Sequence, residues 1–400
     1  MAKAVYIGAL DISHNGKKMY FGDENSTARK IKKGYLGVNG VARLFYTSGT
    51  KLVYQGSSND GIPVLNGAGI SFGNYALFAG GQTKSTSYPF TVKHSAGAYA
   101  FDRNITKQSI TNLKTARTNL IGGCVGKYAL FCGGYDDSSS SKGLKNVDVY
   151  DEDLTRSNTE MKYVRGASTN GSPKCATIGN HLLITDGTAS TTNFDAFDDE
   201  LTLTNPVTDS LTRYTMAAAS NAKYALFIGG KNTSGTPVAN VVAFDNDLTR
   251  TTSTTLSVRR YDSGAACAGD HVVVAGGFGG NGNGFARVTA VDAYDNNLTR
   301  TTPTPISHAR YTIPSTSLQE HALFPNGDHL GTDYTHSNVD AYDDELTQTI
   351  VTNATPWRRS HMVAAVGDYA LAVGGQGVTS TGSNQSKYLS TIEIFKAESV

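Results

Sequence analysis

Apolar residues are grouped in short runs between polar stretches of this chain, and one such run occurs seven times. Its first copy, Tyr-Ala-Leu-Phe-Ala-Gly-Gly, runs from Tyr75 to Gly81. The other copies, some of them looser, begin at Tyr128, His181, Tyr224, His271, His321 and Tyr369. By subtraction, successive copies start 43 to 53 residues apart. Each copy predicts a short β-strand that ends in Gly-Gly or a close variant, and a period of about 50 residues is typical of the blades of a β-propeller.

Two further anchors recur in each unit and predict four strands per blade. An aromatic residue followed by Asp, as in Phe244-Asp245, ends a third strand, and a repeated Arg such as Arg213 precedes the innermost strand. The last unit lacks an outermost strand, and the stretch around Leu52 has the spacing to supply it. We therefore predict an all-β fold, a seven-bladed β-propeller that an N-terminal strand closes, which removes free sheet edges.

Over residues 50–396 the chain resembles the kelch-type β-propellers. The resemblance rests on the Gly-Gly strands, the period and the aromatic-Asp strands. Kelch repeats usually carry a Trp in the last strand, whereas Trp357 is the one tryptophan of this chain. The resemblance implies a kelch-like seven-bladed architecture.

The N-terminal region carries a different and shorter repeat. The stretch Lys17–Gly22 is echoed by Lys32–Gly37, and Asn39-Gly40 is a strong hairpin-turn signal. Residues 1–43 hold eight basic and three acidic side chains, a balance of +5 against +1 for the whole chain. Such asymmetry indicates an arm that has a partner. We predict a β-hairpin docking arm over residues 1–46 and the propeller over residues 47–400.

The arm also resembles a known module. Residues Ala28 to Phe45, with the run Ala-Arg-Lys-Ile-Lys-Lys-Gly-Tyr-Leu-Gly-Val-Asn-Gly-Val-Ala-Arg, are similar to a segment near the N-termini of structural proteins in phages and prophages of Firmicutes. The alternative is an N-terminal hairpin that any bacterial propeller could carry. The side chains expected to dock the arm are basic or aromatic: Lys17, Lys18, Tyr20, Arg29, Lys32, Lys33, Tyr35 and Arg43.

The loops that follow Gly-Gly vary most in length and are rich in Ser, Thr, Gly and Asn. All of them leave one face of a propeller, and variable loops on a fixed scaffold commonly carry recognition. The alternative is that they are tolerated insertions. The candidates for stacking on a sugar or packing on a protein are their aromatic residues: Tyr88, Phe90, Tyr135, Phe278 and Tyr334.

Residue types that carry chemistry are present but do not form a catalytic pattern. Acidic clusters such as Asp343-Asp344-Glu345 recur at one repeat position and lack the twelve-residue calcium-loop pattern, which favours turn capping. The sequence holds no nucleophile elbow, P-loop, zinc motif or dinucleotide fingerprint. We therefore expect no enzyme, no catalytic residues, no metal site and no cofactor.

Taken together, the arm and the propeller predict a virion structural protein of a phage or prophage, as a capsid decoration or as a tail or receptor-binding component. Its expected partners are other virion proteins through residues 1–46 and a host surface glycan or protein through the loops, and a homo-oligomer stays open. One alternative is a bacterial kelch-type protein- or carbohydrate-binding module at the cell surface or in the cytoplasm. A copper oxidase-like enzyme is the less favoured alternative. We expect neither a signal peptide nor a membrane span, and nucleic acid is a disfavoured partner.

Overall fold

The structure is a computed structural model in which the described residues form β-strands, turns and loops and no helix. It describes residues 19–399 without 23–27, 32, 39–40, 48–49, 85–90, 137–142, 167–172, 186–192, 207–211, 283, 329–337, 353–356 and 379–386. By its internal contacts the chain divides into two compact units, Met1–Lys51 with Ala397–Val400, and Leu52–Lys396. Within the described ranges, no helix is long and apolar enough to cross a membrane.

The first unit contains two antiparallel hairpins. Strand β1 (Met19–Gly22) pairs with β2 (Ala28–Ile31), and β3 (Lys33–Val38) pairs with β4 (Val41–Thr47). Five of the expected docking residues lie on these strands: Tyr20, Arg29, Lys33, Tyr35 and Arg43. The other three lie outside the described residues: Lys17, Lys18 and Lys32.

The rest of the described chain forms seven four-stranded antiparallel sheets, named sheets 1 to 7 in chain order. Sheet 1 contains β6 (Ala68–Phe72), β7 (Tyr75–Ala79), β10 (Ala98–Phe101) and β11 (Lys107–Ser109). Sheet 2 contains β12 (Ile121–Val125), β13 (Tyr128–Cys132), β14 (Leu144–Tyr150) and β15 (Arg156–Arg165). Sheet 3 contains β16 (Lys174–Ile178), β17 (His181–Thr185), β18 (Phe194–Asp198) and β19 (Leu203–Thr204). Sheet 4 contains β20 (Ala217–Ser220), β21 (Ala225–Ile228), β22 (Val241–Phe244) and β23 (Arg250–Thr252).

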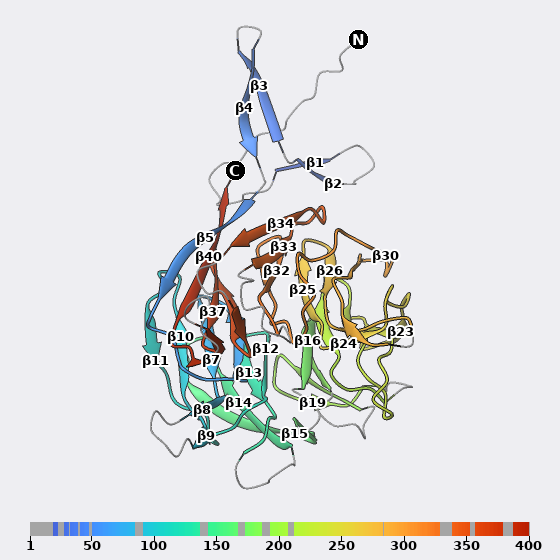
Figure 1. The fold of residues 1–400 in the computed structure, drawn as a ribbon. Coiled ribbons are helices and arrows are strands. Elements are labelled where there is room, and N and C mark those ends of the chain that lie inside the picture. The colour runs from blue at the N-terminus through green and yellow to red at the C-terminus, as the bar shows by residue number, and fades with distance from the viewer. Residues whose placement is uncertain are drawn as a thin grey trace. The chain divides into compact units, whose positions relative to one another are not determined.

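The three remaining sheets repeat this order of strands. Sheet 5 contains β25 (Gly264–Ala268), β26 (His271–Ala275), β29 (Val291–Tyr294) and β30 (Arg300–Thr301). Sheet 6 contains β31 (Thr316–Leu318), β32 (His321–Pro325), β33 (Asn338–Tyr342) and β34 (Gln348–Thr352). Sheet 7 contains β36 (Met362–Val366), β37 (Tyr369–Val373), β40 (Ile392–Ser399) and β5 (Thr50–Ser58), so that strands from both ends of the chain share one sheet (Figure 1).

The core lies between neighbouring sheets. In sheet 4 both Leu226 and Phe227 are fully buried, although they point to opposite faces of β21. The Phe227 ring meets Phe194 of sheet 3 at a centroid distance of 4.9 Å, whereas Leu226 packs in a cluster with Val272 of sheet 5. A strand that is covered on both faces must be apolar at successive positions, which explains why the Gly-Gly strands are continuous hydrophobic runs.

The first strands of the sheets are neighbours in chain order. Strand β6 lies next to β12, and the sequence of neighbours continues through β16, β20, β25, β31 and β36, which in turn lies next to β6. In sheet 7 the side chain of Leu52 on β5 is buried, and the Tyr54 ring lies 5.8 Å from that of Phe395 on β40. The stretch around Leu52 therefore packs as a fourth strand in the last sheet.

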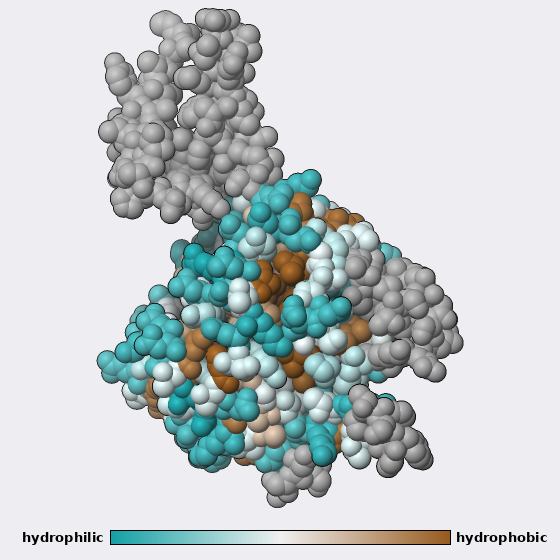
Figure 2. Space-filling view, turned by 90° about the vertical axis from the view of Figure 1, so that its left-hand side faces the viewer, coloured by the Kyte–Doolittle hydropathy of each residue, from teal (hydrophilic) through white to brown (hydrophobic). Residues whose placement is uncertain are grey.

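Three small sheets extend the loops that follow Gly-Gly. The first contains β8 (Gln82–Lys84) and β9 (Val92–His94). The second contains β24 (Arg260–Tyr261), β27 (Phe278–Gly279) and β28 (Ala286–Arg287). The third contains β35 (Trp357–Arg359), β38 (Gln376–Val378) and β39 (Lys387–Tyr388). On the face that Figure 2 presents, hydrophobic residues are dispersed among hydrophilic ones. The candidate site described below lies at the first residues of these loops.

Candidate functional site

A buried arginine stands at the point where the chain enters the first strand of sheets 2 to 7: Arg117, Arg165, Arg213, Arg260, Arg310 and Arg358. In five sheets its guanidinium group is paired with a carboxylate of the third strand: Asp148, Asp195, Asp292, Asp340 and Glu393. Sheet 4 has Val242 at the corresponding place, and Arg213 donates to the carbonyl oxygens of Gly229 at 2.8 Å and Asn240 at 2.9 Å. The arginine thus ties the incoming segment to the body of each sheet.

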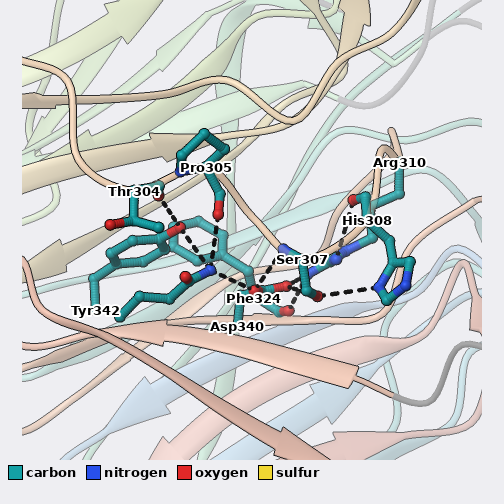
Figure 3. Close-up of polar contacts among 9 residues, drawn as sticks. Thr304, Pro305, Ser307, His308, Arg310, Phe324, Asp340 and Tyr342 are labelled. Carbon is teal, nitrogen blue, oxygen red and sulfur yellow. Dashed lines mark hydrogen bonds and ion pairs between the residues drawn. The ribbon is translucent and has the colours of Figure 1, made fainter.

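Sheet 6 shows the hydrogen bonds around such a pair (Figure 3). The Arg310 Nη2 atom lies 2.6 Å from Asp340 Oδ2 and also donates to the Phe324 carbonyl oxygen at 3.0 Å. Asp340 accepts three more hydrogen bonds, from the backbone N–H of Ser307 at 2.8 Å, from the Ser307 hydroxyl at 2.9 Å and from Gln348 Nε2 at 2.8 Å. A buried carboxylate is costly unless it is paired and hydrogen-bonded, and Asp340 meets both conditions.

In sheets 4 to 7 the residue that directly follows the buried arginine occupies the same position of the repeat: Tyr214, Tyr261, Tyr311 and Arg359. The backbone turns sharply directly beyond it, because the next residue has a positive φ: Thr215 at 56°, Asp262 at 52°, Thr312 at 47° and Ser360 at 53°. These conformations are costly for residues other than Gly, and β-branched Thr is a clear outlier. Backbone hydrogen bonds join these turns between adjacent sheets, from Asp262 N–H to the Thr215 carbonyl oxygen at 3.0 Å and from Thr312 N–H to that of Asp262 at 2.7 Å.

The Gly-Gly pair allows the residue that follows it to lie beside the residue that follows the arginine. A Cβ atom on Gly230 would lie 2.8 Å from the Tyr214 carbonyl oxygen, and one on Gly277 would lie 2.7 Å from that of Tyr261. Only glycine permits this approach, and both glycines also have a positive φ. The approach allows antiparallel bridges between the residue after Arg and the residue after Gly-Gly, in the pairs Tyr214 and Lys231, Tyr261 and Phe278, Tyr311 and Asp328, and Arg359 and Gln376.

These eight residues form a continuous line across four sheets, which we call the aromatic–charged row: Tyr214, Lys231, Tyr261, Phe278, Tyr311, Asp328, Arg359 and Gln376. Between sheets 4 and 5, the Lys231 Nζ atom lies 4.1 Å from the centroid of the Tyr261 ring. Between sheets 5 and 6, the rings of Phe278 and Tyr311 are 5.9 Å apart. Between sheets 6 and 7, Arg359 Nη1 lies 3.0 Å from Asp328 Oδ2. All but the buried Asp328 are half-buried, so the row keeps a surface toward solvent.

The charges of the row perturb its titratable groups. Burial, and then the nearby Asp262, raises the pKa of Tyr261, and burial together with Asp328 raises that of Tyr311. Burial also raises the pKa of the Asp262 carboxyl, whereas Lys174 and Lys231 oppose that rise. Tyr261 and Tyr311 therefore keep their protons at neutral pH, and a protonated hydroxyl can donate a hydrogen bond.

The loop residues expected to bind a ligand fall into two groups. Phe278 lies in the row, where its ring is 5.5 Å from that of Tyr261. Tyr135 holds the corresponding place in sheet 2, bridges Thr118, and packs edge-on against His94 at 5.1 Å. The other three lie outside the described residues: Tyr88, Phe90 and Tyr334.

Sequence reasoning missed most of the row. Tyr214, Tyr261 and Tyr311 were not among the candidates, although each directly follows a repeated arginine. This Arg-Tyr dipeptide, present in three successive units, is the signal that could have found them. Lys231 and Arg359 carry no comparable signal, because their importance lies in contacts between sheets.

The acidic clusters cap turns, as the spacing predicts. Asp245 Oδ1 accepts the backbone N–H groups of Asp247 at 3.0 Å and Thr249 at 2.8 Å. Five further units repeat this pair of bonds, at Asp102, Asp151, Asp198, Asp295 and Asp343. Among the described residues, no group of three or more His, Cys, Asp or Glu side chains is arranged to hold a metal ion.

Comparison with known proteins supports the fold alone. No family model matches the chain, and no curated protein matches it. Among 460 matching chains of solved structures is one described as "Structure of YjhT", with a TM-score of 0.53 and 12% identity, over 73% of this chain and 98% of that chain. With the sheet topology, this likeness shows an all-β, propeller-like fold. A fold shared by so many chains does not assign a function.

Proposed function

We propose that the seven sheets are the blades of a kelch-like propeller that β5 closes. Each sheet repeats the same strand order, and the first strands are neighbours through to β36 and β6. Backbone hydrogen bonds link the sharp turns of adjacent sheets, from Asn119 N–H to Asn66 O at 2.9 Å and from Asn66 N–H to Ser360 O at 3.0 Å. The second bond joins the first sheet to the last, as a ring requires.

We further propose that the chain is a non-enzymatic structural protein of a phage or prophage virion, either a capsid decoration or a tail or receptor-binding component. Residues 1–46 dock it to other virion proteins, and the propeller is displayed for recognition of a host surface glycan or protein. The observation that carries the recognition part of the proposal is the aromatic–charged row, which lies at the base of the variable loops. The compact unit of paired hairpins supports a separate docking function.

Mass spectrometry of purified particles tests the virion assignment. We expect the chain in intact particles at a fixed ratio to the major capsid or tail protein. A variant without residues 1–49 should be missing from particles although it is soluble and folded. Absence of the full chain from intact particles would overturn the proposal.

A free-standing bacterial binding module is the second candidate. It is favoured by the position of the whole row within Leu52–Lys396, which forms a compact unit without the arm. Strong ligand binding by that unit, in a host genome that lacks phage structural genes next to this gene, would support the module over the virion protein.

A further inference from the structure

We propose that the aromatic–charged row binds a saccharide, an inference that rests on the recognition function proposed above. Tyr261, Phe278 and Tyr311 stand in succession, with centroid distances of 5.5 Å and 5.9 Å between neighbouring rings. Each of the three residues is half-buried, so part of it remains open to solvent, and the planes of neighbouring rings are inclined at 46° and 65°. A pyranose offers a matching surface, because one face of the sugar consists of C–H groups and its rim consists of hydroxyls.

The polar ends of the row suit those hydroxyls. At one end Arg359 donates to Asp328 at 3.0 Å and to Gln376 Oε1 at 2.9 Å, which fixes its planar guanidinium group. A guanidinium, a carboxylate and an amide side by side provide both donors and acceptors for adjacent hydroxyls. At the other end Lys231 is held over the Tyr261 ring at 4.1 Å. Groups that are already oriented lose little freedom on binding, which favours affinity.

The same composition argues against a protein partner as the occupant of the row. The cores of protein interfaces are enriched in Tyr, Phe and Arg but depleted in Lys and Asp, and the row places Lys231 and Asp328 directly beside its rings. Among the described residues, the large hydrophobic side chains exposed to solvent lie elsewhere, at Val92, Val164, Phe285 and Ile350. A row without an exposed aliphatic anchor, but with hydroxyls and paired charges, fits a sugar better than an apolar side chain.

The test uses the full chain on an array of bacterial surface oligosaccharides, followed by calorimetric titration of the strongest hit. We expect Tyr261→Ala to weaken binding at least tenfold. The matched control is Tyr128→Ala, because Tyr128 is also half-buried under a lysine, Lys127 at 5.5 Å, but begins its strand at the end away from Gly-Gly. It should change binding by less than twofold. If Tyr261→Ala does not fold, Arg359→Lys provides the test instead. This variant keeps the positive charge but loses the planar guanidinium group, and we expect it to weaken binding tenfold as well.

Three outcomes would overturn the inference: no binding on the array, equal loss in Tyr261→Ala and Tyr128→Ala, or particle attachment to host cells that survives periodate but not protease. That last result would identify a protein receptor. The virion proposal stands or falls separately, through the presence of the chain in particles. A chain absent from particles that still loses sugar binding on Tyr261→Ala would refute the virion role and support the saccharide site.

Discussion

A buried arginine and a carboxylate are withdrawn from water together in five of the seven sheets. Desolvation of two charges is costly, so such a pair adds little net stability compared with apolar residues of the same shape. Removal of one partner is different, because it leaves an uncompensated charge in the core. The pairs therefore specify how the chain enters each sheet, and through that entry they position Tyr261, Tyr311 and Arg359 in the row.

The first prediction concerns Asp340. We expect Asp340→Asn to lower the free energy of unfolding by about 3–5 kcal/mol, because Arg310 remains buried without its counter-ion. Urea denaturation followed by fluorescence measures the change. Glu345→Gln, on an exposed side chain in the same sheet, is the control and should stay within about 0.5 kcal/mol. Equal stability of the two variants would show that the pair does not hold the segment.

The second prediction concerns the buried His361. Burial, and then the nearby Arg358, holds the pKa of its imidazole well below 6.5, its ordinary value in an unfolded chain. As the pH falls below about 6.5, the unfolded chain takes up a proton that the folded protein does not bind. His361 therefore contributes full stability above that pH and progressively less below it.

The test replaces His361 with the residue found at the corresponding place in sheet 4, Met216. We expect His361→Met to reduce the drop in Tm between pH 7 and pH 5, measured by calorimetry. His181→Tyr is the control, because Tyr128 already begins the corresponding strand of sheet 2. An unchanged pH profile in His361→Met would contradict the prediction.

At the scale of elements, the turn between the third and fourth strands of a sheet combines a capping Asp with a Leu of positive φ. Its Asp caps two backbone N–H groups, and the Leu three residues later adopts a positive φ, as Leu248 does at 58°. The conformation of Leu248 is strained, and its side chain packs against the core between sheets 3 and 4. The cap and the packing together hold a turn that glycine would otherwise supply.

The third prediction tests this cap. We expect Asp245→Ala to cost about 0.5–2 kcal/mol of stability, in line with the loss of a side chain that caps backbone N–H groups. Asp245→Asn should cost much less, because an amide oxygen can accept the same bonds, as Asn232 does from Ser234 and Thr236. Chemical denaturation compares the two. A calcium site would behave differently, with Asp245→Asn as harmful as Asp245→Ala and stability that responds to added calcium.

At the scale of the whole molecule, the proposed ring depends on strand β5. Without it, β40 would become an open edge, and open edges invite pairing with other chains. We expect removal of residues 1–49 to leave the seven sheets folded, and removal of residues 1–58 to cause aggregation, as measured by light scattering and Tm. Equal behaviour of the two truncations would count against closure.

A point substitution tests the same strand without truncation. Leu52→Ala should cost about 2–5 kcal/mol because the side chain is buried, and Lys51→Ala, at an exposed neighbour, should cost about 0.5 kcal/mol or less. Thermal unfolding of the full chain measures both. A small effect of Leu52→Ala would mean that β5 is not part of the packed core.

The candidate site was harder to predict than the strands. Phe278 could be predicted because its loop varies in length, whereas Tyr261 lies in a part of the repeat of nearly fixed length and was not among the candidates. Its significance comes from Lys231 of the previous sheet and Phe278 of its own. Contacts of this kind join positions tens of residues apart, and no local pattern encodes which loop ends meet.

An all-β chain, the ends of its Gly-Gly and aromatic-Asp strands, and the capping of turns by its acidic clusters could all be predicted from the sequence. These properties are local: they follow from short apolar runs, from Gly-Gly and from an Asp within reach of its own backbone. The pairing of Arg310 with Asp340 and the alignment of rings and charges from four sheets followed only from the folded structure. The first forms when the entry segment packs on the third strand of its own sheet, and the second when separate sheets pack together. The free energy of burial, which acts between elements, selects both.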